Sequence, residues 1–268
     1  SMLQFSINET NNEKLKARGF EFPIQLSNEG ISTIAGMIAT NASGKRSMKY
    51  GVMKDWIEEV ELVNGKAELI KVSRADLMDV CGMEGITGII VSVRLKIIPI
   101  IKRSYSIFQS DNLDNVLSVT RRLKSENDVV SLELLSPEIS ELMEFPKKYN
   151  LFIEFDSQRG KIIEDEYDAL SKKLDRKFFP IAFKGYHVDE DIKLFFDKIK
   201  EFVLLLEDNK IPYISFLGAG VVHCYFNDEN TFALCTKDGK YFEWPKENVY
   251  VGSTFGNVCQ LDTDCSNR

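Results

Sequence analysis

Two stretches of alternating apolar and polar residues give the clearest structural signal in the chain. Residues 57–63 read I-E-E-V-E-L-V and residues 67–72 read A-E-L-I-K-V, with Asn64 and Gly65 between them. Alternation with a period of two is typical of a strand with one buried face, and Asn-Gly is a favoured two-residue turn. The pattern therefore predicts a β-hairpin.

A further strand pattern follows the hairpin. Residues 88–101 read G-I-I-V-S-V-R-L-K-I-I-P-I-I, which predicts a long strand that Pro99 ends or leaves at a sheet edge.

The segment before the hairpin has a different character. Residues 33–51 are mostly small, with Gly36, Gly44 and Gly51 spaced along them. Such a segment buries little apolar area, and its backbone can approach a flat or phosphorylated ligand closely. A second glycine cluster follows at residues 82–90.

Near the N-terminus we expect a strand at 2–7 and a short helix at 13–18. Beyond Lys102 the strand and helix patterns are mixed. We expect strands at 103–108, 129–135, 149–155, 211–217, 221–226, 231–235 and 240–244. We expect helices at 113–123, 136–143, 162–174 and 189–206. Strands combined with separate helices indicate the α+β class. We therefore expect two α+β domains, residues 1–102 and residues 103–268.

Composition sets looser limits. The net charge of −7 argues against nucleic acid or an anionic membrane as the main partner, and no apolar run approaches the roughly 20 residues of a membrane span. The five cysteines include no C-x-x-C pair, and there are two histidines, so no zinc spacing is present. With no secretory signal, we expect reduced thiols and a cytoplasmic location, either free or at a membrane through a partner.

The two glycine segments resemble conserved blocks of one enzyme family. Residues 33–51 contain T-I-A-G-M-I-A-T-N-A-S-G followed by K-Y-G, and residues 82–90 read G-M-E-G-I-T-G-I-I. They are similar in order and spacing to T-x-G-G-x-x-A-T-N-A-x-G…R-Y-G and G-S-E-G-T-L-G-I-I. These blocks belong to FAD-linked oxidases of the vanillyl-alcohol-oxidase type (PCMH-type FAD-binding), in the branch with the FAD-linked subunits of glycolate oxidase and D-lactate dehydrogenase.

This resemblance implies a fold, a cofactor and a set of binding residues. Residues 1–102 would form the second part of an FAD-binding domain, without the family's first FAD subdomain, and residues 103–268 would form an α+β cap domain for the substrate. The backbone of the following residues would line FAD: Gly36, Met37, Ala39, Thr40, Asn41, Gly44, Glu84, Gly85, Gly88, Ile89 and Ile90. Other interpretations stay open, because Asn41 also suits a left-handed turn and the two isoleucines suit a core strand.

The expected cap domain departs from the family pattern. Its metal-dependent members carry G-H-x-G-D-G-N-L-H, and residues 215–223 keep only Gly218, Gly220 and His223 of that block, while Phe216 replaces a histidine. One histidine cannot hold a divalent cation, so we expect no metal. His223 is the candidate general base, although a lone histidine in a strand is commonly structural. Arg46, Arg74, Arg94 and Arg103 are equal candidates to bind a substrate carboxylate.

Two functional hypotheses follow from the resemblance. The first is an FAD-dependent oxidoreductase that oxidises a small 2-hydroxy acid such as glycolate or D-lactate, with a partner subunit that supplies the missing FAD subdomain or accepts electrons. The second is a non-catalytic or truncated member that acts as an assembly subunit without FAD. A generic α+β binding domain with chance similarity is a third interpretation.

Overall fold

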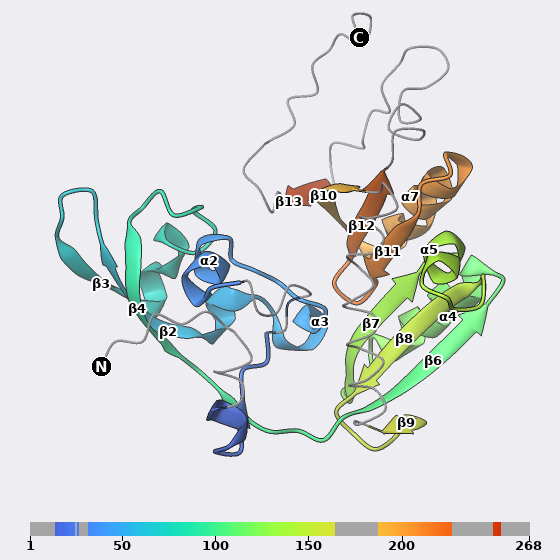
Figure 1. The fold of residues 1–268 in the computed structure, drawn as a ribbon, viewed down its shortest axis with the longest axis horizontal. Coiled ribbons are helices and arrows are strands. Elements are labelled where there is room, and N and C mark those ends of the chain that lie inside the picture. The colour runs from blue at the N-terminus through green and yellow to red at the C-terminus, as the bar shows by residue number, and fades with distance from the viewer. Residues whose placement is uncertain (1–13, 25, 27–31, 164–186, 227–248, 253–268) are drawn as a thin grey trace, which may run out of the picture. The chain divides into compact units, whose positions relative to one another are not determined.

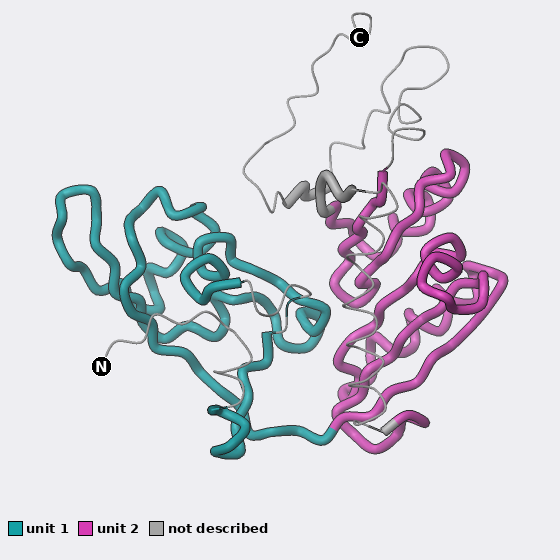
Figure 2. The backbone as a smooth tube through the Cα atoms, in the orientation of Figure 1, with its two compact units in different colours: residues 1–102 teal, residues 103–268 magenta. Residues whose placement is uncertain are grey.

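The chain forms two compact units. The computed structural model describes residues 14–24, 26, 32–163, 187–226 and 249–252. The units are residues 1–102, here unit 1, and residues 103–268, here unit 2 (Figure 2). Each combines antiparallel strands with helices, so the expected α+β class is confirmed.

Unit 1 is built on a three-stranded antiparallel sheet. Its central strand β2 (Ile57–Val63) pairs with β3 (Leu69–Ser73) on one side and with β4 (Ile89–Leu95) on the other (Figure 1). The β2–β3 pair is the hairpin that the alternation predicts. At its tip Asn64 Oδ1 accepts hydrogen bonds from the backbone N–H groups of Lys66 at 2.9 Å and Glu68 at 3.0 Å.

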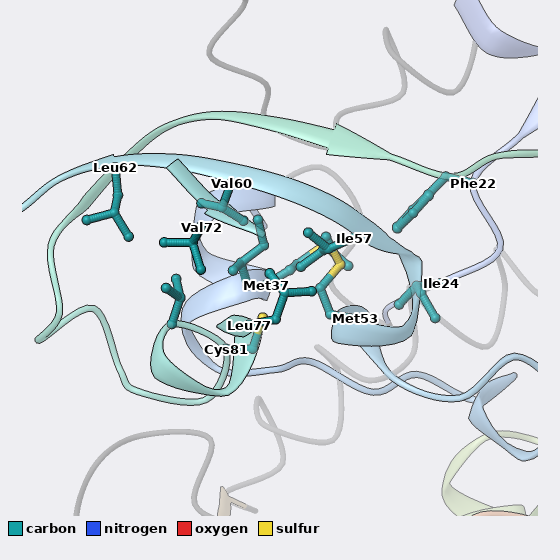
Figure 3. Close-up of a cluster of buried hydrophobic side chains, with 12 residues drawn as sticks. Phe22, Ile24, Met37, Met53, Ile57, Val60, Leu62, Val72, Leu77 and Cys81 are labelled. Atoms are coloured by element: carbon teal, nitrogen blue, oxygen red, sulfur yellow. The ribbon is translucent and has the colours of Figure 1, made fainter. Parts of the chain in front are cut away.

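One face of this sheet carries the core of unit 1. Ile57, Val60 and Leu62 of β2 are buried against the helix α2 (Ile34–Ala39) and two 3-10 helices, η1 (Met53–Trp56) and η2 (Arg74–Asp79), and the pairing of β2 with β4 is irregular between Ile57 and Glu59. Figure 3 shows the side chains of Met37 and Met53 gathered with those of β2. Burying each such side chain stabilises the fold by about 1.5–3 kcal/mol, so the alternation in β2 fixes which face α2 covers.

The opposite face of the sheet is charged. Lys71 Nζ lies 3.1 Å from Glu61 Oε1, and Arg94 Nη2 lies 3.2 Å from Glu59 Oε1. The Ser92 hydroxyl donates to Glu61, and this hydrogen bond, followed by Lys71, holds the pKa of the Glu61 carboxyl below its usual range. This face is therefore built for solvent and does not contribute to the core.

The strand expected at 88–101 is confirmed at residues 89–95, but it ends earlier than expected. β4 ends at Leu95, the Lys96 N–H donates to the Trp56 carbonyl at 2.8 Å, and the chain then forms a separate two-stranded pair. In that pair β1 (Phe20–Glu21) lies antiparallel to β5 (Ile98–Pro99). Since proline has no N–H, a two-residue edge pair accommodates Pro99 and the central part of a sheet would not. The strand expected at 2–7 lies outside the described residues, and residues 14–16 are helical.

Unit 2 contains one antiparallel sheet with the strand order β13-β10-β12-β11-β7-β8-β6-β9. The strands are β6 (Ser104–Ser110), β7 (Val129–Leu135), β8 (Tyr149–Phe155), β9 (Ile162–Ile163), β10 (His187–Leu194), β11 (Tyr213–Phe216), β12 (Val221–Phe226) and β13 (Val249–Gly252). Every residue of β7 and β8 is buried, so these two strands form the centre of the sheet.

The sheet of unit 2 consists of two halves with the same connectivity. In the first half, α4 (Leu113–Leu123) connects β6 to β7, and β8 inserts between these two strands. In the second half, α7 (Phe196–Asp208) connects β10 to β11, and β12 inserts between them. Each half is a split β-α-β unit, and the antiparallel pairing of β7 with β11 joins them (Figure 1).

Several expected elements of unit 2 change type or lie outside the described residues. The helix expected at 189–206 is wrong in its first part, because residues 187–194 form β10 and pair with both β12 and β13, so that α7 begins at Phe196. Residues Ile162–Ile163 form β9, while the rest of the helix expected at 162–174 is not described. The strands expected at 231–235 and 240–244 also lie outside the described residues.

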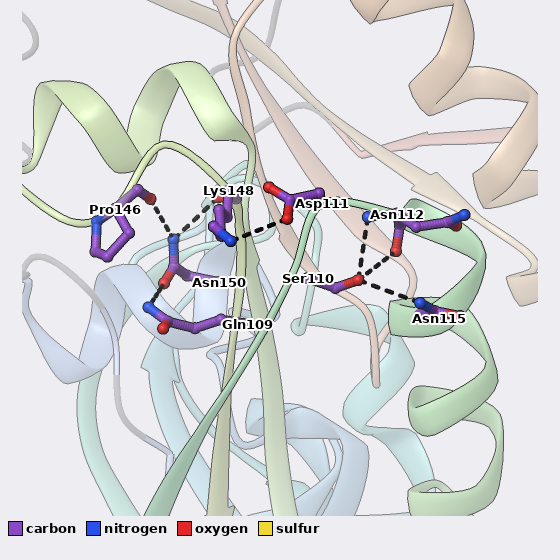
Figure 4. A network of polar contacts seen from close by, with 8 residues as sticks. All are labelled: Gln109, Ser110, Asp111, Asn112, Asn115, Pro146, Lys148 and Asn150. Atoms are coloured by element: carbon purple, nitrogen blue, oxygen red, sulfur yellow. Dashed lines mark hydrogen bonds and ion pairs between the residues drawn. The ribbon is translucent and has the colours of Figure 1, made fainter.

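A buried asparagine organises the connection before β8. The helix α5 (Pro137–Leu142) begins after Ser136, whose hydroxyl accepts from the Ile139 N–H at 3.2 Å. The Asn150 side chain, fully buried in β8, donates to the carbonyl oxygens of Pro146 at 3.0 Å and Lys148 at 2.9 Å and accepts from Gln109 (Figure 4). The Asn150 side chain thus makes the hydrogen bonds that water would otherwise make to these loop carbonyls, which no strand pairing satisfies.

Candidate functional site

The two glycine segments meet in unit 1 through backbone hydrogen bonds. The Gly82 N–H donates to the Ile38 carbonyl at 3.2 Å, and the Glu84 N–H donates to the Ala39 carbonyl at 3.0 Å. The two carbonyls lie at the C-terminal end of the helix α2, in the first segment, and the two N–H groups lie in the second segment, shortly before β4. The structure therefore brings together the two blocks that the sequence separates by more than thirty residues.

The first segment is a short capped helix. Thr33 Oγ1 accepts from the Gly36 N–H at 3.0 Å, and a Cβ built on Gly36 would lie 3.1 Å from the same oxygen. The Met37 N–H donates to the carbonyl of the capping residue Thr33 at 2.9 Å, and the Thr40 N–H donates to the Gly36 carbonyl at 3.0 Å. These N–H groups are used inside the protein, so a ligand would contact this helix by surface fit.

The side chains of this segment divide between the core and the turn that follows. Met37 is buried in the unit 1 core, and Thr40 Oγ1 donates to the Gly36 carbonyl at 3.0 Å. Asn41 has φ 47° and its Oδ1 accepts from the Lys54 N–H at 3.0 Å. The left-handed turn is thus the role that the structure gives Asn41. Ala39 is half-buried and Gly44 is buried.

The second segment exposes its backbone. Glu84 and Gly85 have φ of 51° and 78°, both side-chain positions are exposed, and a Cβ built on Gly85 would meet nothing within 4 Å. Gly88 differs, because its Cβ would lie 2.5 Å from the Val63 carbonyl oxygen. Gly85 therefore leaves open space, whereas Gly88 is needed for the close packing of two strands.

The two isoleucines that start β4 have opposite environments. Ile90 packs against the unit 1 core, as a core strand requires, while Ile89 is 72% exposed. Ile86 in the preceding turn is 80% exposed. The surface around the second segment is therefore apolar as well as open.

Tyr50, in the K-Y-G block, carries a buried hydroxyl oxygen without a hydrogen-bond partner. Its N–H donates to the Arg46 carbonyl at 3.0 Å, its carbonyl accepts from Trp56 Nε1 at 2.7 Å, and its ring lies edge-on to the Trp56 ring at 6.1 Å. Gly51 follows with φ 73°, and a Cβ there would collide with the Asp55 carboxylate. The sequence shows the block, but no sequence pattern reveals a buried and unpaired hydroxyl.

The candidate residues of unit 2 form no comparable cluster. His223 lies in β12, half-buried, with its ring edge-on to the Phe216 ring at 5.0 Å. In the part of the chain that the structure describes, no three His, Cys, Asp or Glu side chains are grouped to hold a metal ion. The four candidate arginines, three of which lie in unit 1, all make contacts: Arg74 pairs with Glu58, Arg94 with Glu59 and Arg103 with Glu154, and Arg46 has contacts of its own.

The pair formed by Arg103 and Glu154 lies inside unit 2. Both side chains are at most 3% exposed, and Arg103 Nε is 3.6 Å from Glu154 Oε1. Glu154 also accepts from the Tyr105 hydroxyl at 2.8 Å and the Ser131 hydroxyl at 3.0 Å. Because these donors satisfy the carboxylate, the group is a buried structural network spanning β6, β7 and β8.

Comparison with known proteins decides the nature of unit 1. Residues 8–73 match the family described as FAD binding domain. The matched region makes up most of unit 1, which is therefore similar to this FAD-binding family. The match includes the first glycine segment and the whole β2–β3 hairpin, and it supports FAD as the cofactor.

Two curated relatives and one solved structure extend this result. The chain is 31% identical to glycolate oxidase subunit GlcD of Bacillus subtilis over 32% of the chain and 20% of the relative. It is 26% identical to alkyldihydroxyacetonephosphate synthase of Caenorhabditis elegans over 66% of the chain and 29% of the relative. A solved alkyldihydroxyacetonephosphate synthase superposes with a TM-score of 0.64 at 17% identity, covering 83% of this chain and 56% of that one.

These comparisons confirm the fold but cover only part of each curated relative. The structural likeness extends over both units, so the matched part of the chain has the fold of that solved synthase. The matched stretches span less than a third of either curated relative. No helix among the described residues has the length and apolar character needed to cross a bilayer.

The residues of this FAD-binding unit fit the cofactor that the family implies. A dinucleotide needs open backbone for close approach and polar groups that are not already used. Gly85 supplies an open position with positive φ, and Tyr50 supplies a hydroxyl that no protein group engages. Gly36, Gly44 and the turn at Glu84 and Gly85 would lie along the group, while Met37 supports them from the core.

Proposed function

We propose that this chain is part of an FAD-dependent oxidoreductase that oxidises a small 2-hydroxy acid such as glycolate or D-lactate. The observation that carries the proposal is the junction of the two glycine segments, where Gly82 and Glu84 bond to the end of α2. The match of residues 8–73 to an FAD-binding family and the similarity to a glycolate oxidase subunit support it. The flavin, when bound, supplies the hydride-accepting chemistry.

The residues of the chain have separate tasks in this proposal. The α2 helix and the Glu84–Gly85 turn hold the cofactor, and the unit 1 core fixes their relative position. In unit 2, His223 is the candidate to take the proton of the substrate hydroxyl, and its half-buried imidazole lies edge-on to the Phe216 ring. A partner chain that completes the FAD site or accepts electrons belongs to the same proposal.

A flavin-retention experiment tests this function. The purified chain is mixed with FAD, desalted, and its absorption in the flavin bands is measured before and after anaerobic addition of glycolate or D-lactate. Retained flavin that loses its colour with a hydroxy acid supports the proposal. A chain that retains no flavin, alone or with a partner, contradicts it and favours an assembly role without FAD.

A glycine substitution tests where the cofactor lies. Gly85→Val should abolish flavin retention, because the new side chain enters open space beside the junction. The control is Gly19→Val, since Gly19 has nearly the same φ of 80° and also faces open space, but lies in the turn before β1. Equal flavin retention in both variants would contradict the assignment.

A second candidate activity rests on the length of one alignment. The C. elegans relative aligns with 66% of the chain, which is more than unit 1 alone can supply, so the likeness extends into unit 2. Unit 2 is the expected substrate domain, and the activity that this relative's name states, synthesis of alkyldihydroxyacetone phosphate, is therefore the alternative. Retained flavin that no 2-hydroxy acid reduces would favour it.

A further inference from the structure

Among the described hydroxyl groups of unit 1, that of Tyr50 is buried and makes no hydrogen bond. A buried hydroxyl without a hydrogen bond costs free energy, and most such groups in folded proteins have a partner. Two buried hydroxyls lack one among the described residues, Tyr50 Oη in unit 1 and Thr120 Oγ1 in α4 of unit 2. An orphan of this kind beside a binding segment is a candidate ligand contact.

The position of this hydroxyl is fixed by the rest of the residue. The backbone of Tyr50 is bound on both sides, to the Arg46 carbonyl and to Trp56 Nε1, and its ring packs against the Trp56 ring. Trp56 in turn lies edge-on to the Phe22 ring at 6.4 Å. The backbone bonds hold the residue and the ring contact holds its side chain, and in this arrangement the hydroxyl makes no hydrogen bond.

The surroundings connect Tyr50 to the FAD-binding segment. Tyr50 and Ala42 pack against the same core cluster as Met37 of α2, and the Met53 N–H donates to the Ala42 carbonyl at 2.9 Å. Tyr50 is the last residue of the short helix α3 (Ser47–Tyr50), and the segment from Gly44 to Tyr50 carries three half-buried cations, Lys45, Arg46 and Lys49, which have contacts of their own. A positive segment with one unused donor suits an anionic, oxygen-rich ligand such as a dinucleotide.

We infer that the Tyr50 hydroxyl donates a hydrogen bond to an acceptor oxygen of the bound FAD. The inference rests on the proposed function, because it requires that the chain binds this cofactor. It adds a specific side-chain contact to a site that is otherwise formed by backbone and surface fit. In the protein without cofactor the hydroxyl stays unpaired, so its hydrogen bond is made only on binding.

The test compares FAD affinity and apoprotein stability for Tyr50→Phe. Binding is measured by quenching of flavin fluorescence on titration of the full chain, and stability by urea denaturation without FAD. We expect FAD to bind about tenfold more weakly to the variant, within a range of about 5- to 50-fold. The apoprotein should be at least as stable as the wild type, because the removed hydroxyl has no protein partner.

Thr120→Val is the matched control, since it removes the other unpaired buried hydroxyl from a different unit. It should leave FAD affinity unchanged. Equal FAD affinity in Tyr50→Phe and the wild type would overturn the inference and leave the proposed function standing. A less stable Tyr50→Phe apoprotein would also overturn it, since the hydroxyl would then have a protein partner. A wild-type chain that binds no FAD would overturn both the inference and the proposed function.

Discussion

Replacing Asn150 with alanine should destabilise unit 2 much more than an ordinary surface substitution. The side-chain amide donates to Ser140 Oγ at 2.8 Å and to the carbonyl oxygens of Pro146 and Lys148, and its Oδ1 accepts from Gln109 Nε2 at 2.6 Å. Asparagine has two N–H donors, so the three acceptors share them. Alanine removes all of these bonds and leaves buried acceptors without partners.

The magnitude follows from the number of bonds. Two donor hydrogens and one acceptor are lost, each worth about 0.5–1.5 kcal/mol net, and the orphaned carbonyls add desolvation, so we expect a loss of about 2–4 kcal/mol. Urea denaturation followed by circular dichroism measures the free energy of unfolding. Hydrogen exchange should show the added opening in residues 143–150, next to α5 and β8, and little change in unit 1.

Asn115→Ala is the matched control for this experiment. Its amide also appears in the same polar network (Figure 4), but it is exposed and makes one long hydrogen bond, 3.5 Å to Ser110 Oγ. The same substitution there should change stability by no more than about 0.5 kcal/mol. If Asn150→Ala lies within that range as well, the reasoning from buried hydrogen bonds is refuted.

Two further predictions concern buried charges and phenols in unit 2. Glu154→Gln should lower stability by about 3–5 kcal/mol, because Arg103 keeps its charge inside the protein. Glu141→Gln, whose pair with Lys147 is exposed, should cost at most about 1 kcal/mol. Similar urea midpoints for both variants would contradict this. Burial, followed by Glu207, raises the pKa of the Tyr149 and Tyr213 hydroxyls above the usual 10.0. In the unfolded chain these phenols ionise near pH 10 while the folded ones stay neutral, so stability should be lost as the pH rises above about 10. Tyr213→Phe should flatten this loss in urea titrations between about pH 8 and pH 11, and an unchanged slope would count against the role of Tyr213.

Sequence patterns predicted the elements whose own periodicity matches their environment. Residues 113–123, 129–135 and 149–155 form a helix and two strands with the expected bounds, because each has a strong apolar pattern that the core uses. The β2–β3 hairpin is correct for the same reason, with Asn64 supplying the turn chemistry. These elements contribute to the buried cores of both units.

The elements that the sequence missed are set by partners distant in the chain. The helix α2 contains small residues without helical periodicity, and it depends on the Thr33 cap and on the packing of Met37. β10 has an acidic pattern typical of a helix start, yet strands on both sides pair with it. The likeness of the two halves of the unit 2 sheet appears only in the connectivity, since no repeat is visible in the residues.

The candidate site was predictable to the level of its blocks but not of its atoms. The order and spacing of the two glycine segments indicated that they belong together, and the backbone bonds of Gly82 and Glu84 show how they meet. The distinct roles of Gly85 and Gly88, open space in one case and strand packing in the other, depend on what lies opposite each residue. The unpaired Tyr50 hydroxyl is equally a property of three-dimensional packing.

The outer strands of the unit 1 sheet have a consequence for handling the protein. Among the described residues β3 and β4 each pair on one side, and β3 is guarded by Lys71 in its centre. β4 begins with the highly exposed Ile89 and contains a single charge, Arg94. A long apolar edge of this kind is a template for adding strands. Concentrated preparations of unit 1 alone should therefore precipitate through β4, and a lysine in place of Ile89 is the change that would keep them in solution.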